Sequence, residues 1–237
     1  MAVGCNHANM ACPLTVQAAL DFKSEYGPHK TIHLGDIFDT TAWRTGAKGN
    51  KDETVDIGDD VKSGLTFLSR LEPDLVFLGN HDIRPWNELD NPKAIVRMAA
   101  EGFTDKVKDF IENDLGAELV GHYDISKSWR MLGDCVIGHG FVYNETAIRD
   151  HAEYHGKSCI IAHLHRQGME QARNSLGATG YCIGYLGDPS KFTYANRTRS
   201  KSKWTRGWAY GEYCDNETTV NFFNFEKRCQ KTLFQNA

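Results

Sequence analysis

Four short clusters of Asp, Asn and His constrain this chain more than any other feature. Each cluster directly follows an apolar run that is typical of a β-strand, at residues 30–34, 74–78, 134–137 and 158–162. The clusters are Gly35-Asp36-Ile37-Phe38-Asp39, Leu78-Gly79-Asn80-His81-Asp82, Gly138-His139-Gly140 and His163-Leu164-His165. Polar side chains delivered from the ends of neighbouring strands can meet at one edge of a sheet. The pattern therefore predicts a metal-dependent hydrolase.

The composition is that of an ordinary globular protein. The chain has 237 residues, of which 24% are charged and 41% are apolar. We expect a single domain over residues 1–237, with a motif-bearing core at about 1–170 and C-terminal strands and a basic loop at about 180–237. The net charge of −4 gives no general attraction to nucleic acid or to membranes.

Several sequence features predict a cytoplasmic protein. The first residues lack the basic and long apolar regions of a secretion signal, and no apolar run is long enough to span a bilayer. The seven cysteines form an odd set without a CxxC pair, and several lie in strand-like runs. We interpret most of them as buried thiols in a reducing compartment.

Strand-like runs alternate with helical patterns, which is typical of an α/β fold. Helices are predicted at 13–26, at 61–71, around 103–111 with an end near Gly116, and at 147–155. From about residue 181 the pattern changes. Residues 181–186, 207–213 and 218–225 are expected to form antiparallel strands, with Asp215-Asn216 as a hairpin turn.

Two segments have a biased composition. Residues 52–60 hold five acids in nine positions and are predicted to form a solvated loop. The stretch 191–206 interleaves cations with aromatic residues: Lys191, Arg197, Arg199, Lys201, Lys203 and Arg206 with Phe192, Tyr194 and Trp204. Two interpretations of this stretch stay open. It is either a mobile surface loop or a loop that contacts the phosphates of a polyanionic substrate.

The residue types in the clusters suit a site with two metal ions. The carboxylate of Asp36 can bridge two cations, and Asn80 offers a neutral amide oxygen. His139, His163 and His165 offer imidazole nitrogens. Two metals about 3.5–4 Å apart can hold a phosphoryl group and a bridging hydroxide for in-line attack. The remaining histidines match no cluster and are interpreted as surface or satisfied core residues: His29, His33, His122, His151 and His155.

In order and spacing the clusters resemble the calcineurin-like metallophosphoesterase superfamily, whose motifs are GDxxD, GNH(D/E), a later His-Gly and GHxH. The resemblance covers about residues 1–170 and implies a four-layer α/β/β/α sandwich with a dinuclear metal centre at one end. By matching position it implies that Asp36 bridges the metals, that Asn80, His139 and His163 complete one site, and that His7 and His165 serve the other. It also implies that His81 contacts the phosphate and protonates the leaving alkoxide, while Asp39 orients His81.

The chain departs from the family pattern at two places. Ala162 stands where the last motif usually has Gly, which keeps a small residue there. The first motif is usually Asp-x-His, and here it reads Cys5-Asn6-His7. Either the Cys5 thiolate is a ligand, or Cys5 is a small buried thiol and the first site is weak. A thiolate ligand favours zinc or iron, so we expect two divalent ions, with manganese, zinc or iron preferred over magnesium.

Two functions from different classes are compatible with these residues. The first is a metal-dependent phosphoesterase (a phosphatase, phosphodiesterase or nuclease) that uses a metal-bridging hydroxide with His81 as general acid. The alternative is a metal-poor, catalytically weak relative that acts as a protein-binding scaffold. The missing carboxylate at Cys5 favours the scaffold. Retention of His81 favours the enzyme, because a scaffold needs no proton donor.

The substrate is expected to be a phosphorylated small molecule or a nucleic acid, and no membrane contact or obligate protein partner is expected. Arg84 and Arg166 follow the clusters and could clamp a phosphate, and Trp86 could stack a base. The basic stretch favours a nucleotide or nucleic acid. Monoester and diester substrates both stay open.

Overall fold

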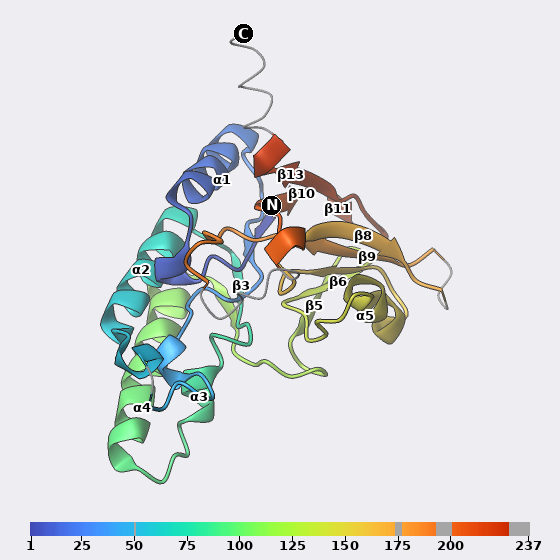
Figure 1. The fold of residues 1–237 in the computed structure, drawn as a ribbon. Helices are drawn as coiled ribbons and strands as arrows, with labels where there is room; N and C mark the ends of the chain where they lie inside the picture. The colour runs from blue at the N-terminus through green and yellow to red at the C-terminus, as the bar shows by residue number, and fades with distance from the viewer. Residues whose placement is uncertain (50, 174–176, 193–200, 228–237) are drawn as a thin grey trace.

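Two β-sheets lie face to face in the computed structural model, and helices cover their outer faces (Figure 1). The structure describes residues 1–49, 51–173, 177–192 and 201–227. The first sheet has the strand order β13-β10-β1-β2-β3-β4, and the second has the order β5-β6-β7-β9-β8. A small hairpin of β11 (Tyr213–Cys214) and β12 (Glu217–Thr218) stands apart from both.

The middle of the first sheet is parallel, and this directs the site residues to one edge. Its strands are β1 (Ala2–Val3), β2 (Ile32–His33), β3 (Leu75–Phe77), β4 (Glu118–Val120), β10 (Gly207–Tyr210) and β13 (Asn221–Asn224). The strands β1 to β4 pair in parallel, with Ala2 opposite Ile32 and Ile32 opposite Leu75. Parallel neighbours end at the same edge, so the loops that follow β1, β2 and β3 lie together.

The second sheet repeats this arrangement. Its strands are β5 (Trp129–Leu132), β6 (Cys135–Gly138), β7 (Cys159–Ile161), β8 (Gln167–Gln171) and β9 (Thr179–Ile183). The central strands β6, β7 and β9 are parallel, and β5 and β8 are antiparallel edge strands. The loops after β6 and β7 therefore also leave from one edge.

The helices complete four layers. On the outer face of the first sheet lie α1 (Pro13–Tyr26), α2 (Ile57–Leu71) and α4 (Ala94–Asp109), which continues as a π-helix (Phe110–Asp114). On the outer face of the second sheet lies α5 (Ala147–His155), where Ile148 and Ala152 pack on Val136 and Ile161. Between the two sheets lies a further hydrophobic core. It buries residues from both sheets and the loops beside them, among them Leu34, Phe77 and Ile137.

The remaining elements are short. They are α3 (Arg84–Asn87) and the 3₁₀ helices Ala8–Met10, Thr41–Trp43, Lys51–Thr54 and Lys201–Lys203. No helix in the described part of the chain is long and apolar enough to cross a membrane.

The predicted four-layer α/β/β/α sandwich is confirmed by these layers. The predicted helices 13–26 and 147–155 have the observed bounds of α1 and α5. The helix predicted at 61–71 begins earlier, at Ile57, because Asp56 caps it by accepting the N–H groups of Gly58 (2.7 Å) and Asp59 (3.2 Å).

Two expectations about local structure were wrong in part. The segment at 181–186 was expected to be an antiparallel strand, and β9 is antiparallel to β8 but pairs parallel with β7. The acidic stretch 52–60 was expected to be a solvated loop, but it contains a 3₁₀ helix and the first turn of α2, and Asp60 is buried. The other late strands, β10 and β13, are antiparallel as expected.

Candidate metal centre

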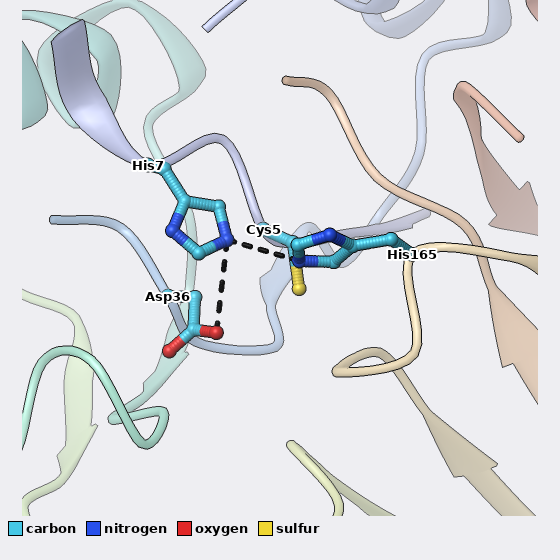
Figure 2. A group of neighbouring side chains, drawn as sticks. All are labelled: Cys5, His7, Asp36 and His165. Atoms are coloured by element: carbon cyan, nitrogen blue, oxygen red, sulfur yellow. Dashed lines mark hydrogen bonds and ion pairs between the residues drawn. The ribbon is translucent and has the colours of Figure 1, made fainter. Parts of the chain in front are cut away.

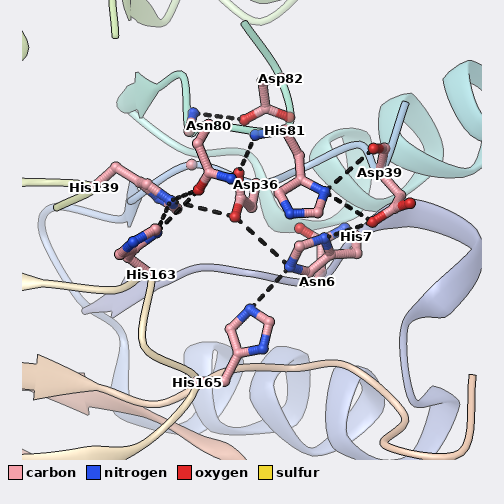
Figure 3. A network of polar contacts seen from close by, with 12 residues as sticks. Asn6, His7, Asp36, Asp39, Asn80, His81, Asp82, His139, His163 and His165 are labelled. Atoms are coloured by element: carbon pink, nitrogen blue, oxygen red, sulfur yellow. Dashed lines mark hydrogen bonds and ion pairs between the residues drawn. The ribbon is translucent and has the colours of Figure 1, made fainter. Parts of the chain in front are cut away.

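The loops that follow β1, β2, β3, β6 and β7 meet at one edge of the sandwich. Figure 3 shows the polar side chains that they bring together. They bring together the seven predicted ligands and the two predicted catalytic residues: Cys5, His7, Asp36, Asp39, Asn80, His81, His139, His163 and His165. Residues from positions 5 to 165 therefore form one cluster. It is assembled by strand order and not by proximity in the sequence.

Five of the predicted ligands lie in the left-handed backbone region: Cys5, His7, Asp36, His163 and His165. This conformation costs a non-glycine residue about 1–2 kcal/mol. Their φ angles fall between 51° for His7 and 60° for His163. Strain of this kind persists where the surrounding structure holds a residue in place, and it gathers at functional sites.

One group of donor atoms surrounds the carboxylate of Asp36 on the side of the second sheet. His139 Nε2 lies 3.2 Å from Asp36 Oδ2 and 3.2 Å from Asn80 Oδ1. His163 Nδ1 lies 2.9 Å from Asn80 Oδ1 and 3.3 Å from His139 Nε2. Asp36, His139 and His163 thus bring potential ligand atoms within 4.8 Å of one another, and Asn80 Oδ1 contacts both imidazoles.

A second group shares Asp36 and lies toward the first strand (Figure 2). It contains Cys5, His7, Asp36 and His165, whose ligand atoms lie within 4.8 Å of one another. His7 Nε2 is 3.0 Å from His165 Nε2 and 3.7 Å from Asp36 Oδ2. Cys5 is fully buried, and burial together with the charge of Asp36 raises the pKa of its thiol in the metal-free protein.

The donor set fits cations. His139 Nδ1 donates to the carbonyl oxygen of Leu34 (2.6 Å), so its Nε2 lone pair faces the oxygens of Asp36 and Asn80. Buried lone pairs that face one another repel unless a positive charge lies between them. Burial lowers the pKa of His139, but the negative charge of Asp36 more than offsets burial and the net pKa is raised.

Asp39 connects the second group to His81. Its Oδ1 lies 3.1 Å from His7 Nδ1 and 2.9 Å from His81 Nδ1, and its Oδ2 accepts the hydroxyl of Thr41. Burial raises the pKa of Asp39, but the bonds from both imidazoles outweigh it and hold the carboxyl group ionised. Burial also lowers the pKa of His81, and here the charges of Asp36 and Asp39 prevail, so the net pKa is raised.

Two residues that hold the loops together were given no role in the sequence analysis. Asp82 accepts the N–H groups of Ile37 (3.2 Å), Phe38 (2.8 Å) and Gly79 (2.9 Å) and so joins the loops after β2 and β3. Burial and the charge of Asp36 raise the pKa of Asp82 to about 7. Its place in the second sequence cluster was the only available signal.

The other residue is Asn6, between two predicted ligands. Its Nδ2 donates to the carbonyl oxygen of Ile37 (3.0 Å), and its Oδ1 accepts from His33 Nε2 (2.8 Å). His33 is therefore a satisfied core residue, as expected. His151 is satisfied in the same way, because Nδ1 donates to the carbonyl oxygen of Ala147 (2.6 Å) and Nε2 accepts the N–H of Phe141 (2.9 Å).

A pocket of about 480 Å³ opens onto the candidate metal-binding residues. Its lining residues are Asp36, Asn80, His81, Tyr143, Asn144, Glu145, His163, Leu164, His165, Arg166, Lys203 and Trp204. Arg166 donates to the backbone carbonyl oxygen of Glu145 (2.8 Å). Lys203 Nζ lies 3.3 Å from the side-chain carboxylate of the same Glu145. The ring of Trp204 is 4.6 Å from that of His165. The basic stretch 191–206 was the sequence signal for Lys203 and Trp204.

The other predicted substrate contacts lie as follows. The Arg84 guanidinium donates to the backbone carbonyl of Asp39 (2.6 Å), and Trp86 packs against Phe103 at 6.1 Å between ring centroids. Phe192 is buried, with its ring 5.0 Å from that of His7. Tyr194, Arg197 and Arg199, which belong to the predicted phosphate-contacting loop, fall outside the described residues.

Comparisons with known proteins give a likeness in structure only. The sequence has no significant match to a protein-family model or to a curated protein. A metallophosphoesterase from Sphaerobacter thermophilus is 15% identical, with a TM-score of 0.44, over 99% of this chain and 92% of its own. Yfce, a phosphoesterase from E. coli, is 11% identical, with a TM-score of 0.40, over 94% of this chain and 97% of its own.

Proposed function

We propose that this protein is a metal-dependent phosphoesterase with two divalent ions at the edge of the sandwich. The observation that carries the proposal is that two groups of donor atoms share the single carboxylate of Asp36. Asn80, His139 and His163 would hold one ion, and Cys5, His7 and His165 would hold the other. When bound, the two ions would supply the positive charge that activates a water molecule and the phosphoryl group for in-line attack.

His81 is proposed as the general acid. It lines the pocket beside Asp36, and Asp39 lies 2.9 Å from its Nδ1. That contact directs the other ring nitrogen, Nε2, away from Asp39 and makes it the atom that would give a proton to the leaving oxygen. Anions on both sides favour the protonated ring, which is the form that a general acid needs.

Cys5 is proposed as a thiolate ligand. Its sulfur belongs to the group formed with His7, Asp36 and His165, and its backbone is held in the left-handed region beside theirs. A thiolate favours soft or borderline ions, so zinc or iron would suit this position better than magnesium. Manganese would suit the position of Asn80, His139 and His163, where an amide oxygen stands in place of the sulfur.

The substrate is proposed to be a nucleotide or a nucleic acid, in which the enzyme would hydrolyse a phosphate ester. Arg166 and Lys203 place two cations at the rim of the pocket beside the half-buried ring of Trp204. Cations can contact additional phosphates, and an aromatic ring can stack a base. The Arg84 guanidinium supports the turn at Asp39 by donating to its backbone carbonyl oxygen. A contact between Arg84 and a substrate phosphate stays a prediction.

Two broader predictions accompany this function. The site takes residues from position 5 to position 204, so the core and the C-terminal segment are proposed to work as one domain. Six cysteines in the described part of the chain are free thiols, and a cytoplasmic location stays a prediction.

The alternative function is a protein-binding scaffold with little metal. The thiol at Cys5 in place of a carboxylate is the observation that favours it. Against it, Asp39, His81 and the donor groups are held in hydrogen-bonded positions that a scaffold does not require.

The decisive experiment compares metal-free protein with protein loaded with manganese or zinc. Each is assayed with chromogenic phosphomonoesters and phosphodiesters, nucleotide monoesters, cyclic dinucleotides and single-stranded DNA. Turnover that requires about two ions per chain supports the phosphoesterase. Stable protein that binds no more than a trace of metal and hydrolyses none of these substrates supports the scaffold.

A further inference from the structure

Asp60, on the first turn of α2, turns its carboxylate inward to the loop that carries Asp39. Its Oδ2 accepts the N–H of Thr40 at 2.8 Å and that of Asp39 at 3.1 Å. The residue is only 4% exposed, whereas its neighbour Asp59 is exposed on the same helical turn. Two charge-assisted bonds therefore fasten the backbone of this loop to α2.

The fastened backbone has a conformation that needs support. Thr40 has φ 45° and ψ 40°, a left-handed conformation that is unfavourable for a β-branched residue. Its hydroxyl donates to the backbone carbonyl of His81 at 2.6 Å. The Thr40 turn is thus connected to both Asp39 and His81. Asp39 directly precedes Thr40 in the chain, and the backbone carbonyl of His81 accepts the hydrogen bond from the Thr40 hydroxyl.

A close approach of α2 to the loop lets the short Asp60 side chain reach these N–H groups. Gly64 lies one helical turn after Asp60, and a Cβ atom at this position would overlap the ring of Phe38. Glycine at position 64 therefore sets the spacing between helix and loop, and Asp60 makes the polar contacts across it.

We propose that Asp60 is a positioning residue for proton donation: it holds the Thr40 turn and so sets Asp39 and His81 relative to each other. This role rests on the proposed function. It does not involve contact with substrate or metal, because Asp60 acts through the backbone of residues 39 and 40.

The energetic cost of this arrangement supports a role other than stability. Burial raises the pKa of the Asp60 carboxyl group to about 6, which means that its ionised form is disfavoured in the folded protein. A buried carboxylate that disfavours folding near neutral pH is typical of a position selected for function.

The test uses metal-loaded full-length protein and two phosphate esters that differ only in the acidity of the leaving phenol, p-nitrophenyl and phenyl phosphate. Asp60→Ala removes the acceptor, Asp60→Asn keeps an amide oxygen for the Thr40 N–H, and Asp59→Ala is the matched control on the same helical turn. Metal content and the amide hydrogen exchange of residues 39 and 40 are measured for each variant.

We expect Asp60→Ala to keep its metal and to lose about 10–100-fold in kcat/KM with phenyl phosphate, but only a few-fold with the nitrophenyl ester, which needs little protonation. The amides of Asp39 and Thr40 should exchange faster. Asp60→Asn should recover most of the loss, and Asp59→Ala should match the wild type. If Asp60→Ala does not fold, Gly64→Ala gives a second route, because displacing α2 should produce the same dependence on the leaving group.

Equal losses on both esters, or Asp60→Ala that matches Asp59→Ala, would overturn the positioning role while leaving the phosphoesterase intact. Asp60→Asn as impaired as Asp60→Ala on phenyl phosphate would also overturn it. Metal-loaded wild-type protein that hydrolyses no phosphate ester would overturn the phosphoesterase and this role together.

Discussion

Asp39 Oδ1 lies 2.9 Å from Nδ1 of His81, and the same oxygen lies 3.1 Å from Nδ1 of His7. One carboxylate atom therefore orients both the proposed proton donor and a proposed metal ligand. Each imidazole turns its Nδ1 toward Asp39, so that Nε2 faces the site. The proposed proton donation and metal binding would thus be coupled through a group that needs to touch neither substrate nor metal.

Asp39→Asn should impair both functions. Losing the shared anion should lower the pKa of His81, so the protonated acid would be lost at a lower pH and the alkaline limb of the pH–rate profile should move toward acid. We expect turnover near neutral pH to fall about 10–100-fold, with weaker metal affinity. A pH–rate profile whose alkaline limb stays in place would contradict this role of Asp39.

His81→Ala should separate chemistry from metal binding. Because His81 is proposed as an acid and not as a ligand, metal content should stay near two ions per chain. Turnover should fall about 10²–10⁴-fold for esters with poor leaving groups and less for nitrophenyl esters. The measurement is kcat over a series of leaving groups, and a loss that is uniform across the series would argue against His81 as the acid.

Cys5 should give its metal position a spectroscopic signature. If its thiolate is a ligand, protein loaded with Co²⁺ should show sulfur-to-cobalt charge-transfer absorption that Cys5→Ser lacks. Cys5→Ser should also weaken this position, and Cys5→Asp should shift its preference toward manganese or magnesium. With zinc bound, the sulfur should lie about 2.3 Å from the ion. A metal-bound structure with the sulfur more than about 4 Å from either ion would leave Cys5 as a packing residue.

The free energy of unfolding should carry a component from Asp60 that decreases as pH rises. Burial raises its pKa to about 6 in the folded chain, against about 3.9 in the unfolded chain. Between these values the folded state binds more protons, so stability falls with rising pH, by about 3 kcal/mol once pH exceeds 6.

Asp60→Asn should remove this component. Urea unfolding at pH 4 and pH 7 should show the variant gaining stability relative to the wild type as pH rises, whereas Asp59→Asn, at an exposed position, should show no such gain. A stability difference that is independent of pH would contradict the buried carboxylate.

The meeting of the proposed ligands at one place could be predicted because strand order fixes where the ends of the strands lie. Asp36, Asn80 and His139 each follow a strand in a sheet of parallel neighbours, and parallel strands end at a common edge. The sequence also marks α1 by Pro13 at its start and Gly27 after its end. The bounds of α1 and α5 were both predicted correctly.

The missed features depend on tertiary contacts. In the sequence, Asp60 is one of the five acids in residues 52–60. Only the tertiary approach of Gly64 to Phe38 places its side chain against the Thr40 turn. The strand β8 (Gln167–Gln171) lacks the β-branched residues typical of strands and is held by pairing with β9. The direction of β9 depends on its neighbours β7 and β8, which a local pattern does not encode.

The central claim is that two ions share Asp36, and anomalous diffraction from crystals of protein loaded with manganese or zinc tests it directly. We predict two anomalous peaks about 3.5–4 Å apart on either side of the Asp36 carboxylate. One should lie among Asn80, His139 and His163, and the other among Cys5, His7 and His165. In Asp36→Asn crystals both peaks should weaken together. A single peak, or two peaks that Asp36 does not bridge, would contradict the dinuclear centre.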